Sequence, residues 1–370
     1  MRVLLLKDIA SPYRIPLFNE LAGRRGIELR VLFLSRNDPR RNYPFYADEL
    51  RFDWGVLRGR EFHRGLRWVI SSRGVSSELE RFRPDILIVG GWSQPGFWQA
   101  IIWSRRTRTP LVLWSESTAR DRRSGFAPLE AAKRFAVRSA SAFLVPGRAA
   151  AAYVESLGAG PARVAVAPNA VDLSLFEQRV AEERVRRAEL RAERGLEGCV
   201  FLCVSRLSRE KGVDVLARAF AGVPGQLLLI GDGPDEPLVR SVAPPTARFV
   251  GRVERDRLPG WYAAADCFVM PSRSETWGMA MNEAAAAGLP IVASEAPGAG
   301  YELIEEGLNG YRVPVEDVEA LRATLARVAG DPGWRVRARS VTLERARTFT
   351  PEAWADAVEA LARRLAQTKP

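Results

Sequence analysis

The stretch that decides the fold is SETWGMAMNEAAAAGLP, residues 274–290. Two carboxylates, Glu275 and Glu283, stand eight positions apart in it, with Gly278 between them and a run of strong helix formers after the glycine. This pattern predicts a helix that starts at Gly278, whose free N–H groups and positive dipole end can bind a phosphate. Glu275 then precedes the helix and can accept hydrogen bonds from sugar hydroxyls. Glu283 lies about two turns inside it and can reach a ribose.

The surrounding segments predict that this helix belongs to a rim of ligand-binding loops. Four apolar segments of the second half are followed by the polar loops SRLSREKG, GDGP, GRV and PSRSETWG. Ligands of open parallel sheets bind beyond the carboxyl ends of the strands, so these loops should lie at one edge. Arg206 offers a rigid guanidinium and Lys211 a mobile ammonium, which together suit a diphosphate. The alternative interpretation of this pair is two solvated charges.

Strand and helix patterns alternate along the chain in two series. The first contains RVLLLK, IELRVLFLS, DILIVG and PLVLWS, and the second begins after residue 198 with CVFLCVSRL, QLLLIGDG, ARFVGR, CFVMPS and IVAS. Continuous apolar strands alternating with amphipathic helices predict an α/β fold with parallel sheets covered on both faces. The charged segment 177–195 between the series is expected to form a surface helix. The segment 350–367 is expected to form a C-terminal helix with Pro at its first position.

Composition narrows the class of protein. The chain has 370 residues and is 47% hydrophobic, which indicates a globular protein of two ordinary domains. Its three cysteines are scattered, so buried thiols are expected instead of a disulfide framework. With one histidine and no Asp-x-Asp pair, a metal site is not expected. The N-terminal apolar run is too short for a signal peptide, and we expect a cytoplasmic protein.

The positive charge is concentrated in the first half. Residues 1–170 hold 28 Lys and Arg against 15 Asp and Glu, whereas residues 171–370 hold 27 against 29. An anionic membrane surface, a phosphorylated acceptor or nucleic acid would match this surplus. Nucleic acid is not expected, because no recognisable binding module occurs. Compositional drift is the alternative, since 51 of the 55 basic residues are arginine. The segment 128–143 carries Lys133, Arg134 and Arg138 beside apolar residues, and could lie on the inner leaflet or simply pack on the core.

The second half closely resembles the retaining glycosyltransferases of family 4, glycosyl transferases group 1, which have the two-domain GT-B fold. The motifs that carry the resemblance, in order and spacing, are PNAVD (168–172), SRLSREKG (205–212), IGDGP (230–234), FVGRV (249–253), PSRSETWGMAMNEAAAAGLPIVAS (271–294) and ELIEEGLNGYRV (302–313). The resemblance is strong over about residues 140–345 and weak over residues 1–140.

The resemblance implies two Rossmann-like domains that face each other across a cleft, with a C-terminal helix crossing back to the first domain. The expected boundaries are 1–170 for an acceptor domain, 171–348 for a nucleotide-sugar donor domain, and 349–370 for the helix. The resemblance also implies a metal-independent transfer of a sugar from a nucleotide diphosphate sugar (UDP or GDP) to a glycan, glycolipid or small-molecule acceptor, without a cofactor and with closure of the two domains. Polysaccharide biosynthesis is the expected setting.

The resemblance assigns roles in donor binding. It implies that Arg206 and Lys211 hold the diphosphate, Glu283 the ribose and Glu275 the donor sugar. The remaining residues expected at the donor are Gly233, the backbone of Thr276, Trp277, Gly278 and Met279, and the Arg252–Val253 loop at the base.

The first domain departs from the family pattern in two places. The family's N-terminal glycine-rich loop is replaced by IASPYRIP (9–16), and its usual histidine after the fifth strand is replaced by Glu116 in PLVLWSEST. We expect Glu116 and Glu275 to be catalytic, and Glu116 to face the sugar or the acceptor. A carboxylate there would repel the diphosphate unless Arg14 or Arg120 compensates its charge. The residues expected on the acceptor side are Tyr13, Arg14, Ser93 and Gln94.

Two alternative functions are compatible with the same pattern. A non-catalytic nucleotide-sugar-binding subunit of a glycosyltransferase complex would explain the missing histidine. A nucleotide-sugar 2-epimerase shares the fold, but we expect more acid–base residues in such an enzyme.

Overall fold

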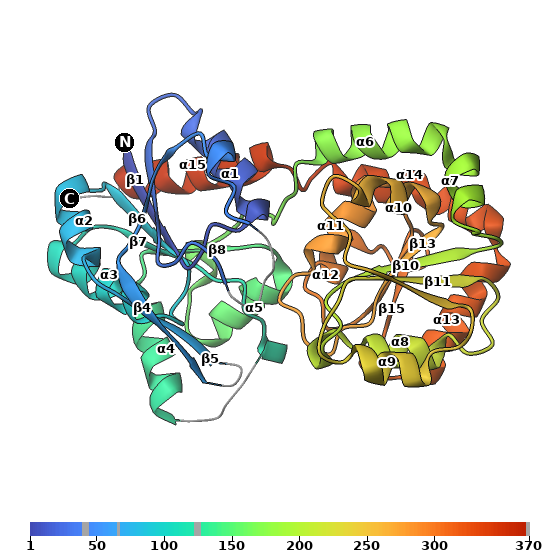
Figure 1. Cartoon of the computed structure of the whole chain (residues 1–370). Helices are drawn as coiled ribbons and strands as arrows, with labels where there is room; N and C mark the ends of the chain where they lie inside the picture. The colour runs from blue at the N-terminus through green and yellow to red at the C-terminus, as the bar shows by residue number, and fades with distance from the viewer. Residues whose placement is uncertain (39–43, 65–66, 122–126, 368–370) are drawn as a thin grey trace. The chain divides into compact units, whose positions relative to one another are not determined.

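The computed structural model describes residues 1–38, 44–64, 67–121 and 127–367, which form two compact units (Figure 1). Unit 1 comprises Met1–Asn169 with Pro351–Pro370, and unit 2 comprises Ala170–Thr350. Both are built on parallel sheets because their strands are continuous apolar runs, each separated from the next by a helix or loop long enough for a crossover.

Unit 1 contains a seven-stranded parallel sheet in the order β3-β2-β1-β6-β7-β8-β9. Its strands are β1 Arg2–Lys7, β2 Glu28–Phe33, β3 Asp53–Val56, β6 Ile86–Val89, β7 Leu111–Trp114, β8 Ala142–Val145 and β9 Val164–Val166. An antiparallel hairpin, β4 Gly59–Arg64 with β5 Arg67–Ser72, stands apart from this sheet. The sequence patterns did not predict the hairpin, whose arginine-rich first strand lacks an apolar run.

Helices cover both faces of the sheet of unit 1. They are α1 Ile15–Ala22, α2 Val75–Phe82, α3 Pro95–Thr107, α4 Ala127–Ser139, α5 Arg148–Ser156 and α15 Pro351–Gln367, with short 3-10 turns η1 Pro12–Arg14, η2 Ala47–Glu49, η3 Ala119–Asp121 and η4 Pro161–Arg163. The core on one face joins β-strand side chains to α2, α3, α4 and α5. The other face is covered by α1, which lies beside the C-terminal helix α15 (Figure 1). The prediction that the last helix packs on the first domain is therefore confirmed.

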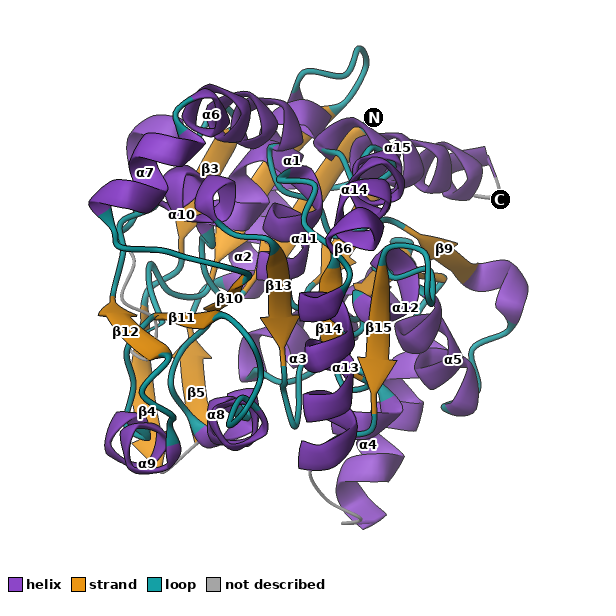
Figure 2. Ribbon diagram, turned by 90° about the vertical axis from the view of Figure 1, so that its right-hand side faces the viewer, coloured by secondary structure: helices purple, strands orange, loops and turns teal. Residues whose placement is uncertain are grey.

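Unit 2 contains a six-stranded parallel sheet in the order β12-β11-β10-β13-β14-β15. Figure 2 shows its strands β13, β14 and β15 side by side. The strands are β10 Val200–Val204, β11 Gln226–Ile230, β12 Ala247–Gly251, β13 Cys267–Met270, β14 Ile291–Ser294 and β15 Gly310–Val313. The helices are α6 Leu173–Val185, α7 Arg187–Glu193, α8 Val213–Ala219, α9 Glu236–Val242, α10 Leu258–Ala264, α11 Met279–Ala286, α12 Gly300–Leu303, α13 Val318–Gly330 and α14 Pro332–Ala346, with the 3-10 turn η5 Arg209–Lys211.

The core of unit 2 contains the three cysteines. Cys199, Cys203 and Cys267 are reduced and buried, as predicted. Burial raises the pKa of the Cys199 thiol to about 12 and that of Cys203 to about 11, because an apolar environment disfavours the thiolate. These thiols are packing groups of the sheet.

The charged segment between the two series differs from its prediction. It forms two helices, α6 and α7, with a break at Arg186, instead of one continuous surface helix. Its arginines reach inward from α7, where the Arg187 and Arg191 guanidinium groups both contact the Asp266 carboxylate at 2.6 and 3.0 Å. The segment is therefore tied to the sheet by charge as well as by apolar contacts.

Candidate donor site and its surroundings

The loops after β10, β11, β12 and β13 form one edge of the sheet of unit 2. Backbone hydrogen bonds join them: Leu207 N–H donates to the Asp232 carbonyl at 2.8 Å, and Arg273 N–H to the Glu210 carbonyl at 2.8 Å. At Gly233 a Cβ atom would come within 2.2 Å of the Leu207 carbonyl oxygen. This close approach explains the glycine in GDGP, because any side chain would force the two loops apart.

The helix predicted from the opening stretch is α11, which begins at Met279 directly after Gly278. Gly278 has φ 100°, and a Cβ atom on it would lie 2.8 Å from the Met270 sulfur. Trp277 is buried, and its indole N–H donates to the Asn282 side-chain oxygen at 2.7 Å. The ring of Trp277 therefore holds the loop against the start of α11. Since this side chain is buried, the polar groups that residues 276–279 offer to a ligand are mainly those of the backbone.

Lys211 and Glu275 are brought together at this edge. The Lys211 ammonium, at the end of η5, forms an ion pair with the Glu275 carboxylate in the loop before α11. Their side chains are partly exposed, at 24% and 14%. The cation assigned to the diphosphate and the carboxylate assigned to the sugar are thus in direct contact.

Arg206 lies in the same group of loops but is exposed. Its charge reaches Glu210: burial alone would raise the pKa of the Glu210 carboxyl, but the Ser208 hydroxyl and the cations Lys211 and Arg206 lower it. Glu210 is exposed, and the lowered pKa of its carboxyl shows that Lys211 and Arg206 both lie near enough to stabilise a negative charge at this edge.

Glu283 is buried on α11, with 6% of its surface exposed. The Tyr262 hydroxyl, from α10, donates a hydrogen bond to Glu283 Oε2 at 2.7 Å. Sequence reasoning missed Tyr262, since its motif, LPGWYAAADC, contains only helix signals. A surface position for Glu283, the alternative to a ligand role, is excluded by its burial.

Arg252 and Val253, predicted near the base, follow β12. Arg252 is exposed and lies 3.9 Å from the Glu254 carboxylate, while Val253 is half-buried. Their contact with a base remains a prediction.

In unit 1, Glu116 and Arg14 meet beyond the carboxyl end of the sheet. The Arg14 guanidinium, in η1, forms an ion pair with Glu116 and donates to the Asn169 side-chain oxygen at 2.6 Å. Lys7 Nζ, at the end of β1, lies 3.9 Å from the same carboxylate. Arg14 is one of the two arginines that the sequence offered as compensation for the charge of Glu116.

The other residues expected on the acceptor side are placed differently. Gln94 is buried, and both polar atoms of its side-chain amide bond the backbone of β5. The amide oxygen accepts from Ile70 N–H at 2.8 Å, and the amide nitrogen donates to the Trp68 carbonyl at 3.1 Å. Gln94 therefore has a structural task in holding the hairpin. Tyr13 is half-buried and Ser93 exposed.

The basic helix α4 packs on the core of unit 1. Of the two alternatives left open for this segment, the inner leaflet and the core, Lys133 favours the core: it is 9% exposed, and its ammonium contacts the Glu130 carboxylate at 3.0 Å and the Tyr153 hydroxyl at 3.3 Å. Val137 is also buried, whereas Arg134 and Arg138 are exposed. The helix packs on the core and presents only these two arginines, because a lysine with a carboxylate partner can be buried at lower cost.

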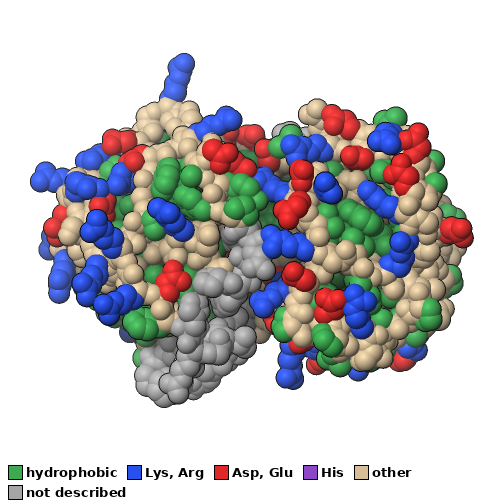
Figure 3. Space-filling view, viewed as in Figure 1, with side chains coloured by type: hydrophobic (Ala, Val, Ile, Leu, Met, Phe, Trp, Pro, Cys, Tyr) green, Lys and Arg blue, Asp and Glu red, His purple; other side chains and the backbone are tan. Residues whose placement is uncertain are grey.

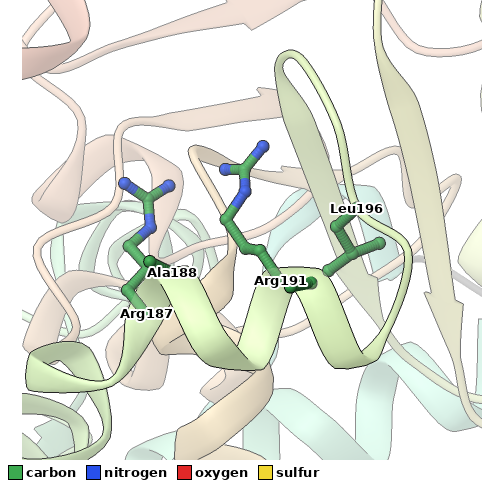
Figure 4. A pocket seen from close by; sticks show the side chains of 5 residues that line it. Arg187, Ala188, Arg191 and Leu196 are labelled. Atoms are coloured by element: carbon green, nitrogen blue, oxygen red, sulfur yellow. The ribbon is translucent and has the colours of Figure 1, made fainter.

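A pocket of about 600 Å³ lies elsewhere on unit 2, along α7 (Figure 4). It is lined by Arg187, Ala188, Arg191, Ala192 and Leu196. The guanidinium groups of Arg187 and Arg191 are taken up by Asp266 and by carbonyls at the C-terminal end of α10. We therefore assign a structural role to these arginines, which neutralise a helix end and a buried carboxylate.

The described residues contain no group of three or more His, Cys, Asp or Glu side chains arranged to hold a metal ion. None of their helices combines the length and apolar character needed to span a bilayer.

Comparison with known proteins identifies the family. Residues 198–331 match the family model described as Glycosyl transferases group 1, and residues 16–170 match the Glycosyl transferase 4-like domain. The two matches together extend over both units, and the chain belongs to the group 1 glycosyltransferases, with the GT-B fold.

Individual curated relatives share about a third or less of their aligned residues with this chain. The sulfoquinovosyl transferase SQD2 of Arabidopsis thaliana is 32% identical over 260 residues, 66% of this chain and 50% of that protein. The D-inositol 3-phosphate glycosyltransferase of Xylanimonas cellulosilytica is 28% identical over 334 residues, 84% of this chain and 74% of that protein. The chain spans about half the length of most of the curated relatives it matches. Among solved structures, Anabaena HepE in complex with UDP has a TM-score of 0.76 at 20% identity, covering 100% of this chain and 99% of that one.

Proposed function

We propose that this protein is a retaining glycosyltransferase that moves a sugar from a nucleoside diphosphate sugar to an acceptor hydroxyl. The observation that carries the proposal is the arrangement around the start of α11. Glu275, paired with Lys211 of η5, precedes the helix, and the buried Glu283, bonded to Tyr262 of α10, lies within it. A diphosphate suits the helix end and the ammonium, a ribose suits Glu283, and a sugar suits Glu275. Family membership supports the same assignment, and so does the solved complex of Anabaena HepE, which has the same fold, with UDP-glucose.

The proposed chemistry is electrostatic. When the bond between sugar and diphosphate breaks, negative charge grows on the leaving phosphate, and Lys211, Arg206 and the N–H groups at the start of α11 would stabilise it. No cofactor is proposed, and we propose that this cationic cluster makes a metal ion unnecessary. A chelator should then leave the rate unchanged, whereas a loss of activity restored by Mg²⁺ or Mn²⁺ would refute metal independence.

We propose that unit 1 holds the acceptor, with Glu116 as the carboxylate that polarises its hydroxyl. Arg14 and Lys7 offset the charge of Glu116, so an ionised carboxylate can be tolerated near an anionic donor. Tyr13, Arg14 and Ser93 lie on the segments that follow β1 and β6 and are the proposed acceptor-side residues.

The test is release of free nucleotide from a panel containing UDP-glucose, UDP-galactose, UDP-N-acetylglucosamine and GDP-mannose, with and without a cell-lipid and oligosaccharide acceptor mixture. We expect acceptor-stimulated release from one donor, lost in Glu283→Gln. Tight nucleotide binding without turnover of any donor would favour the second candidate, a non-catalytic nucleotide-sugar-binding subunit. The observation that favours this candidate is the carboxylate of Glu116, already engaged by Arg14, at the position of the family's histidine.

We further propose that unit 1 works against an anionic membrane surface on the cytoplasmic side, where a lipid-linked acceptor would be found. The support is the surplus of basic residues in the first 170 positions and the exposed Arg134 and Arg138 on α4. Figure 3 shows Lys and Arg side chains gathered along one edge of unit 1.

A further inference from the structure

Trp114, the last residue of β7, is surrounded by cations and by a second tryptophan. Its ring is 1% exposed, with Lys7 Nζ at 4.4 Å and the Arg14 guanidinium carbon at 4.6 Å from the ring centre. On the C-terminal helix α15, Trp354 is fully buried and its ring lies 5.2 Å from that of Trp114, at 39° between the planes. The helix that ends the chain thus packs on a side chain at the carboxyl end of the central sheet.

Hydrogen bonding does not explain why tryptophan occupies positions 114 and 354. Among the described residues, neither the Trp114 nor the Trp354 Nε1 has a hydrogen-bond partner, although both are buried. A buried N–H without an acceptor is unfavourable, and phenylalanine would avoid it. What the indole of Trp114 provides instead is the strongest aromatic face for a cation, and two cations lie within range of it.

Both cations also converge on Glu116. Arg14 is 7% exposed and pairs with Glu116, and Lys7 lies 3.9 Å from the same oxygen. The side chain of Lys7 packs closely over Gly90, which follows β6, because a Cβ atom on this glycine would come within 2.8 Å of the lysine Cδ. The orientation of Glu116 therefore depends on two cations whose own positions depend on the Trp114 ring.

We propose that Trp114, supported from behind by Trp354, is a positioning residue that holds Lys7 and Arg14 so that Glu116 keeps one orientation. This inference rests on the proposed function, in which Glu116 acts on the acceptor. It extends the machinery of the reaction to a residue of the C-terminal helix that touches no ligand.

The test is a double-mutant cycle on turnover, using whichever of UDP-glucose or GDP-mannose supports transfer. Trp114→Phe should lower kcat about ten-fold and leave the KM for the donor unchanged, since the donor residues lie in unit 2. In a Glu116→Gln background the same change should have no further effect, because the group to be positioned has lost its charge. Trp103→Phe is the matched control: it also removes a buried indole N–H without a partner in unit 1, and should leave kcat unchanged. An equal loss in both backgrounds, or no loss at all, overturns the inference.

A second cycle needs no turnover. The thermal midpoint of unfolding should fall less in the double variant Trp114→Phe with Lys7→Met than the sum of the two single shifts, since both remove the same contact. Additive shifts overturn the inference even in a protein that transfers no sugar, whereas an inactive protein with non-additive shifts contradicts only the proposed function. If Trp114→Phe does not fold, Trp354→Phe takes its place in the turnover cycle, with the same expectation at smaller size.

Discussion

Lys211 and Glu275 are 64 positions apart and form an ion pair at the edge of the sheet of unit 2. Such a pair keeps a mobile ammonium at the place where a phosphate would arrive, and an anionic donor would compete with Glu275 for it. A carboxylate released in this way is ready to accept hydrogen bonds from a sugar. In this interpretation the ion pair prepares the site.

Removal of either cation should affect the reaction and not the fold. We expect Lys211→Ala and Arg206→Ala each to lower turnover at least ten-fold, which corresponds to about 1.4 kcal/mol of lost transition-state stabilisation. Steady-state kinetics measure the loss, and circular dichroism with the thermal midpoint serves as the control for folding. Near-normal turnover in a folded variant would contradict the assigned donor site.

Tyr262 offers a test of the ribose contact that leaves the carboxylate in place. Tyr262→Phe keeps the ring, which packs on Phe176 and Phe268 at 5.4 and 6.0 Å, and removes the hydroxyl that orients Glu283. We expect the affinity for UDP or GDP, whichever binds, to fall about five-fold, the equivalent of one hydrogen bond of about 1 kcal/mol. Calorimetric titration measures it. Unchanged affinity would mean that Glu283 is oriented without Tyr262.

At the scale of elements, one carboxylate helps to hold α7 to the sheet, beside the apolar contacts of the helix. Asp266, just before β13, contacts Arg187 and Arg191 and accepts a hydrogen bond from Val200 N–H at 2.8 Å, the first residue of β10. Burial alone would raise the pKa of Asp266, but Arg187, the Val200 N–H and Arg191 lower it. One side chain therefore joins the helix, the start of β10 and the start of β13.

Because the pKa of Asp266 is depressed in the fold, its contribution to stability is complete above the ordinary aspartate pKa of about 3.9 and is lost as the pH falls below it. Asp266→Asn should therefore destabilise the protein at pH 7 by about 3 kcal/mol, since it leaves two arginines without their carboxylate. Thermal melts from pH 7 down to pH 3 should show the difference between variant and parent shrinking at the acid end. A difference that is constant with pH would show that the charge of Asp266 is unimportant.

The elements also show what sequence patterns can and cannot predict. Apolar runs predicted β1, β2, β6, β7 and β10 to β14, because buried parallel strands are continuous apolar runs, and Gly278 marked the start of α11. The predicted runs did not include β3, β8, β9 or β15. The patterns predicted neither the break at Arg186 nor the hairpin β4–β5, whose first strand has no apolar run. They also missed the hydroxyl of Tyr262, because its partner Glu283 lies 21 positions away. For the same reason the pairing of Arg14 with Glu116 could be offered only as one of two possibilities, since 102 positions separate them.

At the scale of the whole molecule, the surplus of basic residues in the first 170 positions is the main feature that the proposed donor site does not explain. Adding the C-terminal helix to unit 1 does not alter the surplus, because residues 351–370 contain three basic and three acidic side chains. A surplus of this size attracts an anionic surface with about 1 kcal/mol for each basic group that comes close to it, and salt screens the attraction.

We therefore expect the protein to float with vesicles containing phosphatidylglycerol and not with neutral phosphatidylcholine vesicles, and to be released by 0.5 M salt, a condition in which screening is strong. Arg134→Gln with Arg138→Gln should weaken the binding, whereas Lys133→Gln, a loss of charge inside the core, should weaken it much less. Equal binding to both vesicle types, or binding that salt does not change, would refute membrane attachment through charge.

The missing Cβ atoms at the donor edge have a consequence for anyone who wants to change which nucleotide this protein uses. At Gly233 a Cβ atom would come within 2.2 Å of a carbonyl oxygen, and at Gly278 it would meet a buried sulfur at 2.8 Å in a backbone conformation suited to glycine. A library that randomises these positions would yield mostly misfolded variants. Arg252 is exposed and Val253 half-buried on the neighbouring loop, so diversity introduced there changes what a base would meet while the edge itself stays intact.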